Sequence, residues 1–343
     1  MVTSYTLKVV DLRKETEDTI TLCFKQPGLR KIKYLAGQYL TLIFRINGRR
    51  YIRPYSFSSA PAVDQQLEVT IKRVLNGIVS NHIHDIIKIG DSIEVMPPLG
   101  DFTCEDDAAS IFLWGVGSGI TPLISIAKQL LSTSDDCQVH LFYGNKNDES
   151  TIFLSQLGLL QNQFSDRFTV KHFYTRMKIS KQIPHVIEGR IDRNNTVSIL
   201  QEFNSIAESK HYICGPIGLK ESVKSALKRF SVSEENIFSE DFELVKNPEE
   251  FNHIRTQRIA LQFEGKTVEI EVIKGKSILE AALDMDLELP YSCQTGNCST
   301  CKAKLVRGEA KMIGLSRQRK DLEKDEYLLC CTHPLTDNVH IEI

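Results

Sequence analysis

The stretch that decides the fold is residues 290–301, PYSCQTGNCSTC. Its cysteines follow the spacing C-x4-C-x2-C and are Cys293, Cys298 and Cys301. A further pair, Cys330-Cys331, comes close to the end of the chain. The N-terminal sequence MVTSYTLKVVDLRKE lacks the apolar segment of an export signal, so we expect reduced thiols rather than a disulfide framework. Cysteines in a reducing compartment are mostly buried, metal-binding or catalytic.

The composition is that of a globular protein with two or three domains. The chain has 343 residues, of which 41% are hydrophobic and 25% are charged, and this length exceeds one ordinary domain. The formal net charge of -2 offers no electrostatic case for nucleic acid or an anionic membrane as partner. No apolar run is long enough to cross a bilayer. These features predict a cytoplasmic protein without a membrane span.

The cysteine spacing is typical of a plant-type [2Fe–2S] site, in which four thiolates hold two irons. Gly296 suits such a loop, because a residue without a Cβ lets backbone amides approach the sulfides. Structural zinc is the alternative, but four-thiolate zinc sites usually show two C-x2-C knuckles. The segment LPYSCQTGNCSTCKAKLVRGE resembles the cluster loop of plant-type ferredoxins, and the resemblance covers residues 258–343.

The fourth cluster ligand is either Cys330 or Cys331. In ferredoxin-type relatives the fourth cysteine is usually followed, after three residues, by proline, and Pro334 meets this condition for Cys330. Counting from Cys301 to relatives with longer loops would favour Cys331 instead. We choose Cys330, because loop lengths vary more readily than the residues that brace a ligand. Cys331 is then expected to be a small buried or half-buried thiol.

The hydrophobic pattern along the chain predicts three domains of different fold class. Short strands rich in Val, Ile, Leu, Thr and Tyr predict an antiparallel β-barrel over residues 1–105. Alternating strand and helix patterns predict an α/β domain with a parallel sheet over 106–243. A polar segment, 244–257, is expected to be a linker. In residues 258–343 the local pattern predicts a hairpin and a helix that begins at a capping box. The resemblance to ferredoxins implies that this domain has an α+β, β-grasp fold.

Two turns in the middle domain have the pattern of a nucleotide site. The turn Gly115–Pro122 follows an apolar strand and opens a helix, so its amides and the positive helix end would face a phosphate. The turn Cys214–Pro216 also follows a strand, and ligands bind at the carboxyl ends of strands in open α/β sheets. A tight turn in another α/β domain and a buried structural thiol are the alternatives.

Two segments of the N-terminal domain suit a flavin. Arg53–Ser56 supplies a guanidinium fork for phosphate, a tyrosine ring to pack on the flavin and a hydroxyl for its polar edge. The alternative is that Tyr55 is an ordinary aromatic residue of a strand in a barrel that binds no flavin. Lys72 and Arg73 end a strand, and residues 77–80 open a short helix whose N-terminus could accept a pyrophosphate.

The order of these four motifs resembles the ferredoxin–NADP reductase superfamily over residues 1–243. With the ferredoxin-type domain, the whole chain resembles reductase subunits of the phenylacetyl-CoA epoxidase type, which are single-chain reductases with FAD, NAD(P)H and [2Fe–2S] domains in this order. The phthalate dioxygenase reductase type, with FMN in the same domain order, is the alternative. The long segment KRVLNGIVS suits a dinucleotide and favours FAD.

The resemblance implies a role for each matching residue. It assigns the flavin ring and its phosphate to Arg53, Tyr55 and Ser56. It assigns the adenine-dinucleotide side to Ile71, Lys72, Arg73, Gly77, Val79 and Ser80. The nicotinamide–pyrophosphate turn, with Thr121 near the flavin ring, comprises Gly117, Gly119, Thr121 and Pro122. The turn beside the transferring hydride and the segment closing the domain near the flavin are Cys214, Gly215 and Pro216, and Glu240 and Phe242. The catalytic residues among these are expected to be Cys214, Tyr55, Ser56 and Thr121. Trp114 departs from the pattern, because relatives more often have a small residue there.

The choice between NADPH and NADH depends on one basic segment. Thr175-Arg176 resembles the Ser-Arg pair that binds the 2′-phosphate in NADPH-using relatives, and Lys178 and Lys181 add positive charge nearby. The segment favours NADPH. NADH stays open, because a solvated basic loop would have the same composition.

The sequence therefore predicts an NAD(P)H-dependent reductase. Hydride would pass to FAD, and single electrons would pass through a [2Fe–2S] cluster to a partner oxygenase or hydroxylase. The linker at 244–257 would let the ferredoxin-type domain swing. A reductase of a soluble ferredoxin or flavodoxin, or a redox sensor that does not turn over, are the alternatives. No residue identifies the partner, its substrate or the oligomeric state.

Overall fold

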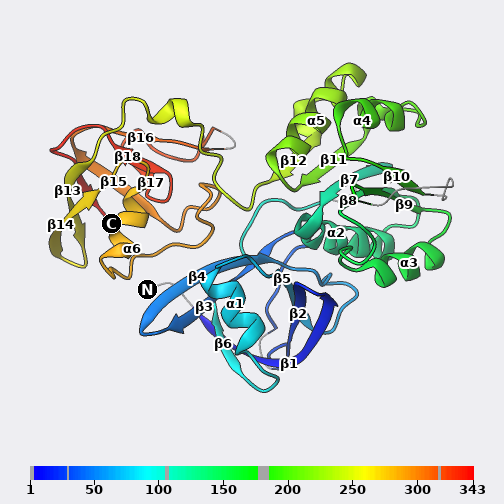
Figure 1. The fold of residues 1–343 in the computed structure, drawn as a ribbon, viewed down its shortest axis with the longest axis horizontal. Helices are drawn as coiled ribbons and strands as arrows, with labels where there is room; N and C mark the ends of the chain where they lie inside the picture. Colours follow the sequence, from blue (N-terminus) through cyan, green and yellow to red (C-terminus); the bar gives the residue numbers. More distant parts are fainter. Residues whose placement is uncertain (1–3, 29–30, 105–107, 177–184, 316–317) are drawn as a thin grey trace. The chain divides into compact units, whose positions relative to one another are not determined.

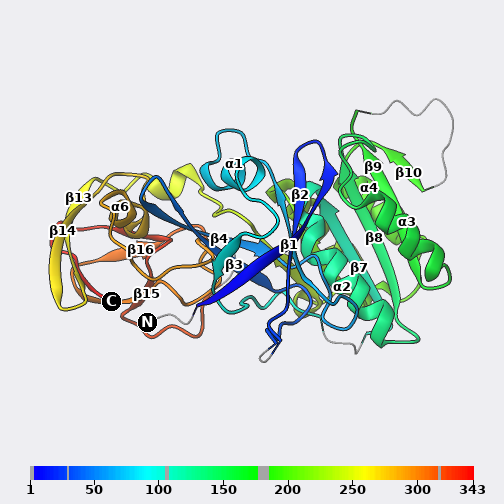
Figure 2. The same ribbon diagram turned by 90° about the horizontal axis from the view of Figure 1, so that it is seen from below.

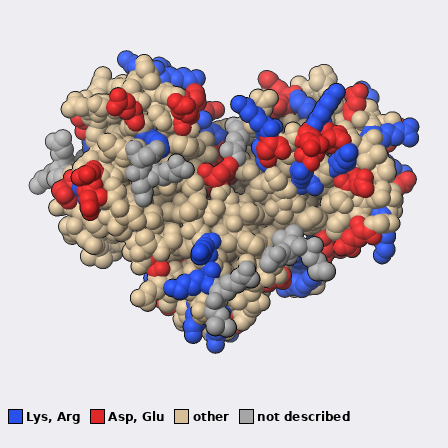
Figure 3. All heavy atoms as spheres, turned by 180° about the vertical axis from the view of Figure 1, so that it is seen from behind, with Lys and Arg blue, Asp and Glu red and all other residues tan. Residues whose placement is uncertain are grey.

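The computed structural model describes residues 4–28, 31–104, 108–176, 185–315 and 318–343. The chain divides into two compact units. In the described part of the chain, one unit holds residues 4–42 and 55–240, and the other holds residues 43–54 and 241–343. Among the described residues, no helix combines the length and apolar character that a bilayer crossing requires. On the face drawn in Figure 3, acidic and basic side chains are intermixed.

The N-terminal domain is a six-stranded sheet with the order β4-β3-β6-β1-β2-β5. Its elements are β1 Tyr5–Thr16, β2 Thr19–Phe24, β3 Tyr39–Ile46, β4 Arg49–Ser56, β5 Leu67–Lys72, β6 Ser92–Val95 and helix α1 Ile78–Asp85. The long strand β1 pairs antiparallel with β6 through its first residues and with β2 through the rest. Strands β1 and β2 can be followed in Figure 2. A bridge from Phe57, directly after β4, to Val69 of β5 links the two edge strands. The predicted antiparallel β-barrel is thereby confirmed.

The middle domain is a parallel sheet with the order β10-β9-β8-β7-β11-β12. Its strands are β7 Ser110–Val116, β8 Gln138–Asn145, β9 Phe168–Tyr174, β10 Val186–Glu188, β11 Lys210–Cys214 and β12 Ile237–Glu240. Its helices and 3₁₀ turns are α2 Ile120–Thr133, α3 Leu154–Gln163, α4 Arg193–Leu200, α5 Ile217–Leu227, η1 Gly117–Gly119, η2 Ile206–Glu208, η3 Lys228–Phe230 and η4 Glu234–Asn236. The chain runs outward from β7 to β10 and then returns to β11 on the other side of β7. The strand order therefore reverses between β7 and β11, which is where open α/β sheets bind ligands.

Helices cover both faces of this sheet, with α2 and α3 on one side and α4 and α5 on the other (Figure 1). Alternate residues of β7 serve the two faces. Leu113 packs with the α2 side, whereas Phe112 and Trp114 pack with the α4 and α5 side. Because both faces are buried, the strand is apolar along nearly its whole length rather than alternating with polar residues.

Trp114, which the sequence left unexplained, is part of a buried aromatic layer. Its ring stacks on Phe142 with the centroids 4.2 Å apart. Its indole Nε1 donates a hydrogen bond to Nδ1 of His211 at 3.2 Å. The second ring nitrogen of His211 lies 2.9 Å from Oγ of Ser209, which in turn donates to the carbonyl of Ile206. The large side chain thus fills the layer beneath α4 and α5 and satisfies its own donor.

The C-terminal domain is an α+β fold, as predicted. Its main sheet has the order β14-β13-β19-β15-β17, and β16 pairs with β18. The elements are β13 Gln257–Phe263, β14 Lys266–Val272, β15 Lys302–Arg307, β16 Ala310–Met312, β17 Glu326–Leu328, β18 Thr332–Pro334, β19 His340–Glu342, α6 Ile278–Asp284 and η5 Pro248–Phe251. Ser277 and Glu280 form the predicted capping box at the start of α6. The predicted hairpin is β13–β14, whose turn is Glu264-Gly265.

Residues 244–257, expected as a linker, are in contact with the domain that follows them. Phe251 and Ile254 are buried in one apolar cluster with Ile313, and Nζ of Lys246 donates to Glu280 at 3.3 Å. The boundary between the two compact units falls after residue 240. A pivot within 244–257 would therefore have to break these contacts.

Candidate functional site

The turn after β7 has the geometry of a phosphate cradle. Gly117 has a φ of +56°, and nothing lies within 4 Å of the place where a Cβ would stand. The turn continues directly into α2, where Oγ1 of Thr121 donates to the carbonyl of Ser118 at 3.1 Å. Tyr143, which sequence reasoning missed, donates its hydroxyl to the carbonyl of Gly117 at 2.9 Å. The open space above Gly117 fits a pyrophosphate approaching the start of α2.

A second turn, after β11, packs directly on the first. Cys214 lies in register with Gly115 on one side and with Glu240 on the other. A Cβ on Gly119 would stand 2.0 Å from the carbonyl oxygen of Cys214. Gly215 has a φ of +157°. The two motifs, about a hundred residues apart in sequence, therefore meet backbone to backbone at the edge where the strand order reverses.

Cys214 is buried at this edge, with 1% of its surface exposed. A side chain so enclosed by its own turn can shape the floor of a site, whereas an attacking nucleophile needs access. Pro216 is the N-cap of α5. Glu240 ends β12 and is half-buried, while Phe242 is 46% exposed.

The flavin-side residues lie on neighbouring parts of the barrel. Ser56 is buried at the end of β4, and Tyr55 beside it is half-buried. Arg53, on the same strand, donates from Nη1 to the carbonyl of Ile52 at 2.8 Å. Ile71 is fully buried in β5, the strand against which the turn η1 lies. The motifs at Tyr55 and at Gly117 are thus brought into one region through β5.

The two cations at the end of β5 are engaged in ion pairs within the barrel. Nζ of Lys72 lies 3.3 Å from the carboxylate of Asp18. Nη2 of Arg73 lies 2.6 Å from Asp85 of α1, and its guanidinium also donates to Asn81. The Arg73 hydrogen bond lowers the pKa of Asp85. The Arg73 pair fastens α1 to the end of β5, whereas the Lys72 pair fastens β5 to the turn between β1 and β2.

The start of α1 is shaped by a compact turn. Gly77 is the N-cap, and Val79 and Ser80 are buried in the first turn of the helix. Oγ of Ser80 accepts a hydrogen bond from the amide of Val74 at 3.1 Å. Leu75, at the tip, is 89% exposed. The turn holds an apolar tip in solvent beside the helix N-terminus, which suits a flat, partly apolar ligand such as adenine.

The segment expected to distinguish NADPH from NADH is only partly described. Thr175 and Arg176 are exposed just beyond the end of β9, and their amides donate to the carbonyls of Asn145 and Lys146. Both residues therefore stand at the surface, where a solvent-exposed phosphate could reach them. Lys178 and Lys181 lie outside the described residues.

The cysteine motif gathers its thiols into one buried group. Cys293 receives hydrogen bonds from the amides of Thr295 at 3.4 Å and Cys298 at 3.3 Å. The thiols of Cys298 and then Cys330, followed by these amides, lower the pKa of Cys293, while the pKa values of Cys298 and Cys330 are raised by sharing a proton with Cys293. Closely packed sulfurs with amide donors suit an iron–sulfur cluster.

The geometry of the loop fits a two-iron cluster. Gly296 has a φ of +74°, and a Cβ there would stand 2.4 Å from Cδ2 of Leu315. Within the described ranges, no three His, Cys, Asp or Glu side chains surround a single ion-sized point. A [2Fe–2S] cluster does not require such a point, because its four thiolates are shared between two irons.

The two candidate fourth ligands differ in their contacts. The thiol of Cys330 is in hydrogen-bond contact with the thiols of Cys293, Cys301 and Cys331. The thiol of Cys331 instead donates to the carbonyl of Leu328 at 3.4 Å and is fully buried. Cys330 therefore contacts two thiols of the C-x4-C-x2-C motif, whereas Cys331 contacts Cys330 and a backbone carbonyl, so these contacts favour Cys330 as the fourth ligand.

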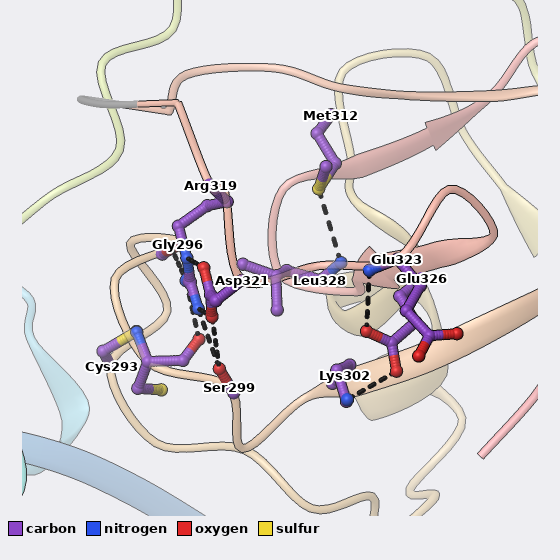
Figure 4. A network of polar contacts seen from close by, with 11 residues as sticks. Cys293, Gly296, Ser299, Lys302, Met312, Arg319, Asp321, Glu323, Glu326 and Leu328 are labelled. Carbon is purple, nitrogen blue, oxygen red and sulfur yellow. Dashed lines mark hydrogen bonds and ion pairs between the residues drawn. The ribbon is translucent and has the colours of Figure 1, made fainter.

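Arg319 is a residue of this site that sequence reasoning missed. It comes from the segment between β16 and β17, and its guanidinium contacts the cluster loop at Gly296, Cys298 and Ser299 (Figure 4). The basic run SRQRK gave no signal, because exposed basic runs are common between strands.

Three domain families match successive parts of the chain. "Oxidoreductase FAD-binding domain" matches residues 6–104, "Oxidoreductase NAD-binding domain" matches 113–225, and "2Fe-2S iron-sulfur cluster binding domain" matches 261–335. The prediction of FAD, a nicotinamide dinucleotide and a [2Fe–2S] cluster is confirmed by these matches.

The chain is also similar to whole proteins. It is 29% identical to one of the subunits of 1,2-phenylacetyl-CoA epoxidase from Escherichia coli (strain K12), with 100% of this chain and 98% of the relative covered. It is 30% identical to "3-ketosteroid-9-alpha-monooxygenase, ferredoxin reductase component" of Rhodococcus rhodochrous, with 99% and 97% covered. Among solved structures it is similar in fold to phthalate dioxygenase reductase, with a TM-score of 0.70, 23% identity, and 99% and 98% of the two chains covered.

Proposed function

We propose a function for a chain that belongs to the family of oxidoreductases with FAD-binding, NAD-binding and 2Fe-2S domains: it supplies electrons from NAD(P)H to a separate oxygenase or hydroxylase. The observation that carries the proposal is the meeting of the turns at Gly117 and Cys214 beside the flavin-side strand β5. The same chain carries the buried cysteine group of the C-terminal domain. The proposed transfer needs both centres, because a nicotinamide delivers a hydride and an iron–sulfur cluster passes on single electrons.

The cofactors supply the redox chemistry when bound, since flavin accepts hydride from a nicotinamide and an iron–sulfur cluster carries single electrons. The protein supplies position. Gly117 and the start of α2 would hold the pyrophosphate of the nucleotide. Arg53 would bind the flavin phosphate, and Tyr55 and Ser56 would hold the ring and its polar edge.

The buried turn at Cys214 would form the wall against which the nicotinamide packs. Thr121, at the first turn of α2, would face the flavin side of the same space. Cys293, Cys298, Cys301 and Cys330 would hold the cluster. The partner is proposed from the names of similar proteins, which include the reductase component of a monooxygenase and one chain of an epoxidase. NADPH as donor and a cytoplasmic location are proposed on the sequence features alone.

The test of the proposal is an anaerobic absorbance titration of the purified protein with NADPH and, separately, with NADH. We expect loss of the flavin bands followed by loss of the broader iron–sulfur absorbance. The nucleotide that acts faster identifies the donor. Flavin reduction without an iron–sulfur signal would overturn the assignment of the cysteines, and no flavin reduction by either nucleotide would overturn the reductase function.

Replacing Cys214 tests its role in that titration. Cys214→Ala should slow flavin reduction by about ten- to hundredfold, because small displacements of a reacting group are costly in rate, while the flavin stays bound. Stopped-flow absorbance measures the rate, and the flavin content of the purified variant is the control. An unchanged rate would contradict the role of Cys214 in holding the nicotinamide.

A further inference from the structure

The guanidinium of Arg319 is enclosed among polar partners of the cluster loop. Its side chain is only 5% exposed, although arginine rarely becomes so buried unless it is paired. Nη1 donates to the carbonyls of Gly296 and, at 3.2 Å, of Cys298. Nη2 donates to Oγ of Ser299 at 2.8 Å. Three successive parts of the loop that carries the cysteines thus converge on one side chain, as Figure 4 shows.

Asp321 fixes the direction of this side chain. Nε of Arg319 donates to Oδ1 of Asp321 at 2.8 Å, and Nη2 donates to Oδ2 at 2.6 Å. A two-point contact of this kind locks the plane of a guanidinium. One edge of the fork is therefore held by the carboxylate, and the opposite edge is presented to the loop.

The segment that carries Arg319 also covers the loop with an apolar side chain. Leu315 occupies the space beside Gly296, where a Cβ would stand 2.4 Å from Cδ2. Ile313, further back, is buried in the cluster with Phe251 and Ile254. The segment is thus anchored at one end and contacts the cysteine loop with both an apolar and a cationic group.

Besides holding the loop, the cation of Arg319 would affect the reduction potential of a [2Fe–2S] cluster, because the cluster is negatively charged. Two ferric ions, two sulfides and four thiolates sum to a net charge of −2, and reduction by one electron makes it −3. The Asp321 carboxylate offsets part of the positive charge, but it is 55% exposed to solvent, whereas the buried guanidinium contacts the cysteine loop itself and so stabilises the reduced state more than the oxidised state. Hydrogen bonds that orient the loop carrying the ligands also affect the stability and reduction potential of the cluster.

We propose that Arg319 is a positioning residue of the iron–sulfur centre, which clamps the loop of residues 296–299 and raises the reduction potential of the cluster. The proposal rests on the function proposed above, since it requires that the cysteines hold a [2Fe–2S] cluster. It concerns this chain's own residues, and it predicts a change in the cluster rather than in hydride transfer.

The experiment compares four variants of the full chain with the unmodified protein. Arg319→Met removes both the charge and the fork. Arg319→Lys keeps the charge but loses the fork, because an ammonium cannot bind two carbonyls and a carboxylate in one plane. Asp321→Asn keeps the guanidinium but weakens its anchor. Arg258→Met is the matched control, because Arg258 lies on β13 of the same domain with a side chain that is 79% exposed.

Two measurements are made on each protein: the reduction potential of the cluster in a dye-linked titration, and the rate at which a chelator removes its absorbance. We expect Arg319→Met to lower the potential and to lose the cluster roughly tenfold faster, the usual effect of removing a group that supports metal ligands. Arg319→Lys should recover most of the potential and little of the resistance to the chelator. Flavin reduction should be unchanged in all four variants.

The outcomes separate this inference from the function on which it rests. An unmodified protein without a cluster spectrum would overturn the proposed function. An unmodified protein with a cluster, together with Arg319→Met of unchanged potential and chelator resistance, would overturn only the role of Arg319. If Arg319→Met fails to assemble a cluster, Arg319→Lys and Asp321→Asn decide the question, because chelator resistance equal to that of Arg258→Met in both would refute the clamp.

Discussion

The two turns proposed to hold the nucleotide (the nucleotide turns, residues 115–122 and 214–216) and the cysteine loop (residues 293–301) are held in place by different kinds of contact. At both places a glycine with positive φ brings the backbone close to a ligand site: Gly117 in one and Gly296 in the other. The nucleotide turns are held by each other, because Gly119 touches the carbonyl of Cys214. The cysteine loop is held by side chains from a separate segment, Leu315 and Arg319.

This difference has a structural cause. Parallel strands place their carboxyl ends side by side, so two turns in register meet without any further device. The cysteine loop forms no ladder within the described sheets, and its contact with a strand is a side-chain one, in which Gln294 donates to the carbonyl of Ile52 in β4 at 3.3 Å. It therefore depends on long-range side-chain contacts, and a substitution outside the motif can disturb it.

The largest expected effect is at the cysteine loop. Cys330→Ser should abolish the iron–sulfur absorbance, because the thiol of Cys330 is in contact with those of Cys293 and Cys301. Cys331→Ser is the matched control and should retain the cluster, because the Cys331 thiol is directed at a backbone carbonyl. Absorbance and iron content measure both. The opposite result would make Cys331 the fourth ligand.

The next largest effect is at the nucleotide turns. Gly119→Ala should slow hydride transfer by roughly a hundredfold, because its Cβ would force the two turns apart and displace the nucleotide. The overpacking should also cost about 1–3 kcal/mol of the free energy of unfolding. Stopped-flow flavin reduction and thermal unfolding measure these two effects.

Gly158→Ala in α3 is the control for that substitution. A Cβ at Gly158 meets nothing within 4 Å, so the change should stabilise the protein by about 1 kcal/mol through helix propensity and leave hydride transfer unaltered. Equal rates in the two alanine variants would mean that the close packing of the turns is not needed for the reaction.

The smallest effect concerns acid stability of the middle domain. Burial lowers the pKa of His211 to about 3, and burial also lowers the pKa values of His140 and His172 to about 4. The unfolded chain takes up these protons near the ordinary histidine pKa of about 6.5, whereas the folded domain does not. Stability is therefore complete above about pH 6.5 and falls as the pH decreases from about 6.5 towards 3.

His211→Asn tests this pH dependence. The variant should be less stable at neutral pH, because the hydrogen bond from Trp114 is lost. Its stability should fall less steeply with decreasing pH, because His211 alone contributes up to about tenfold per pH unit in the folding equilibrium. Denaturant unfolding at several pH values measures the slope. His253→Asn, at an exposed position in the other unit, is the control, and an identical slope in both variants would contradict the prediction.

The sequence was sufficient for the elements whose signals are local. The capping box at Ser277, the hairpin turn at Gly265 and the turn before α2 are each specified within a few residues, and each forms where the pattern predicts. The cysteine spacing predicted the cofactor for the same reason, since the three cysteines of the C-x4-C-x2-C motif lie within one loop.

Other features depend on residues that are distant in sequence. The role of Trp114 could not be predicted, because its hydrogen-bond partner His211 is distant in sequence. The pairing of β7 with β11 brings the two residues together. The contacts of residues 244–257 could not be predicted either, because Phe251 and Ile254 pack against Ile313, which is distant in sequence. The polar composition of the segment gave no sign that these two side chains are buried.

What the sequence by itself determined is the order of the three domains, their fold classes and the chemistry of their motifs, because strand and helix periods, capping residues and ligand spacings act over short distances. The tertiary structure decided that the Cys330 thiol contacts those of Cys293 and Cys301, which glycine has no room for a side chain, and that Arg319 reaches the cysteine loop. These contacts depend on the path of the chain between distant residues, and no local pattern encodes that path.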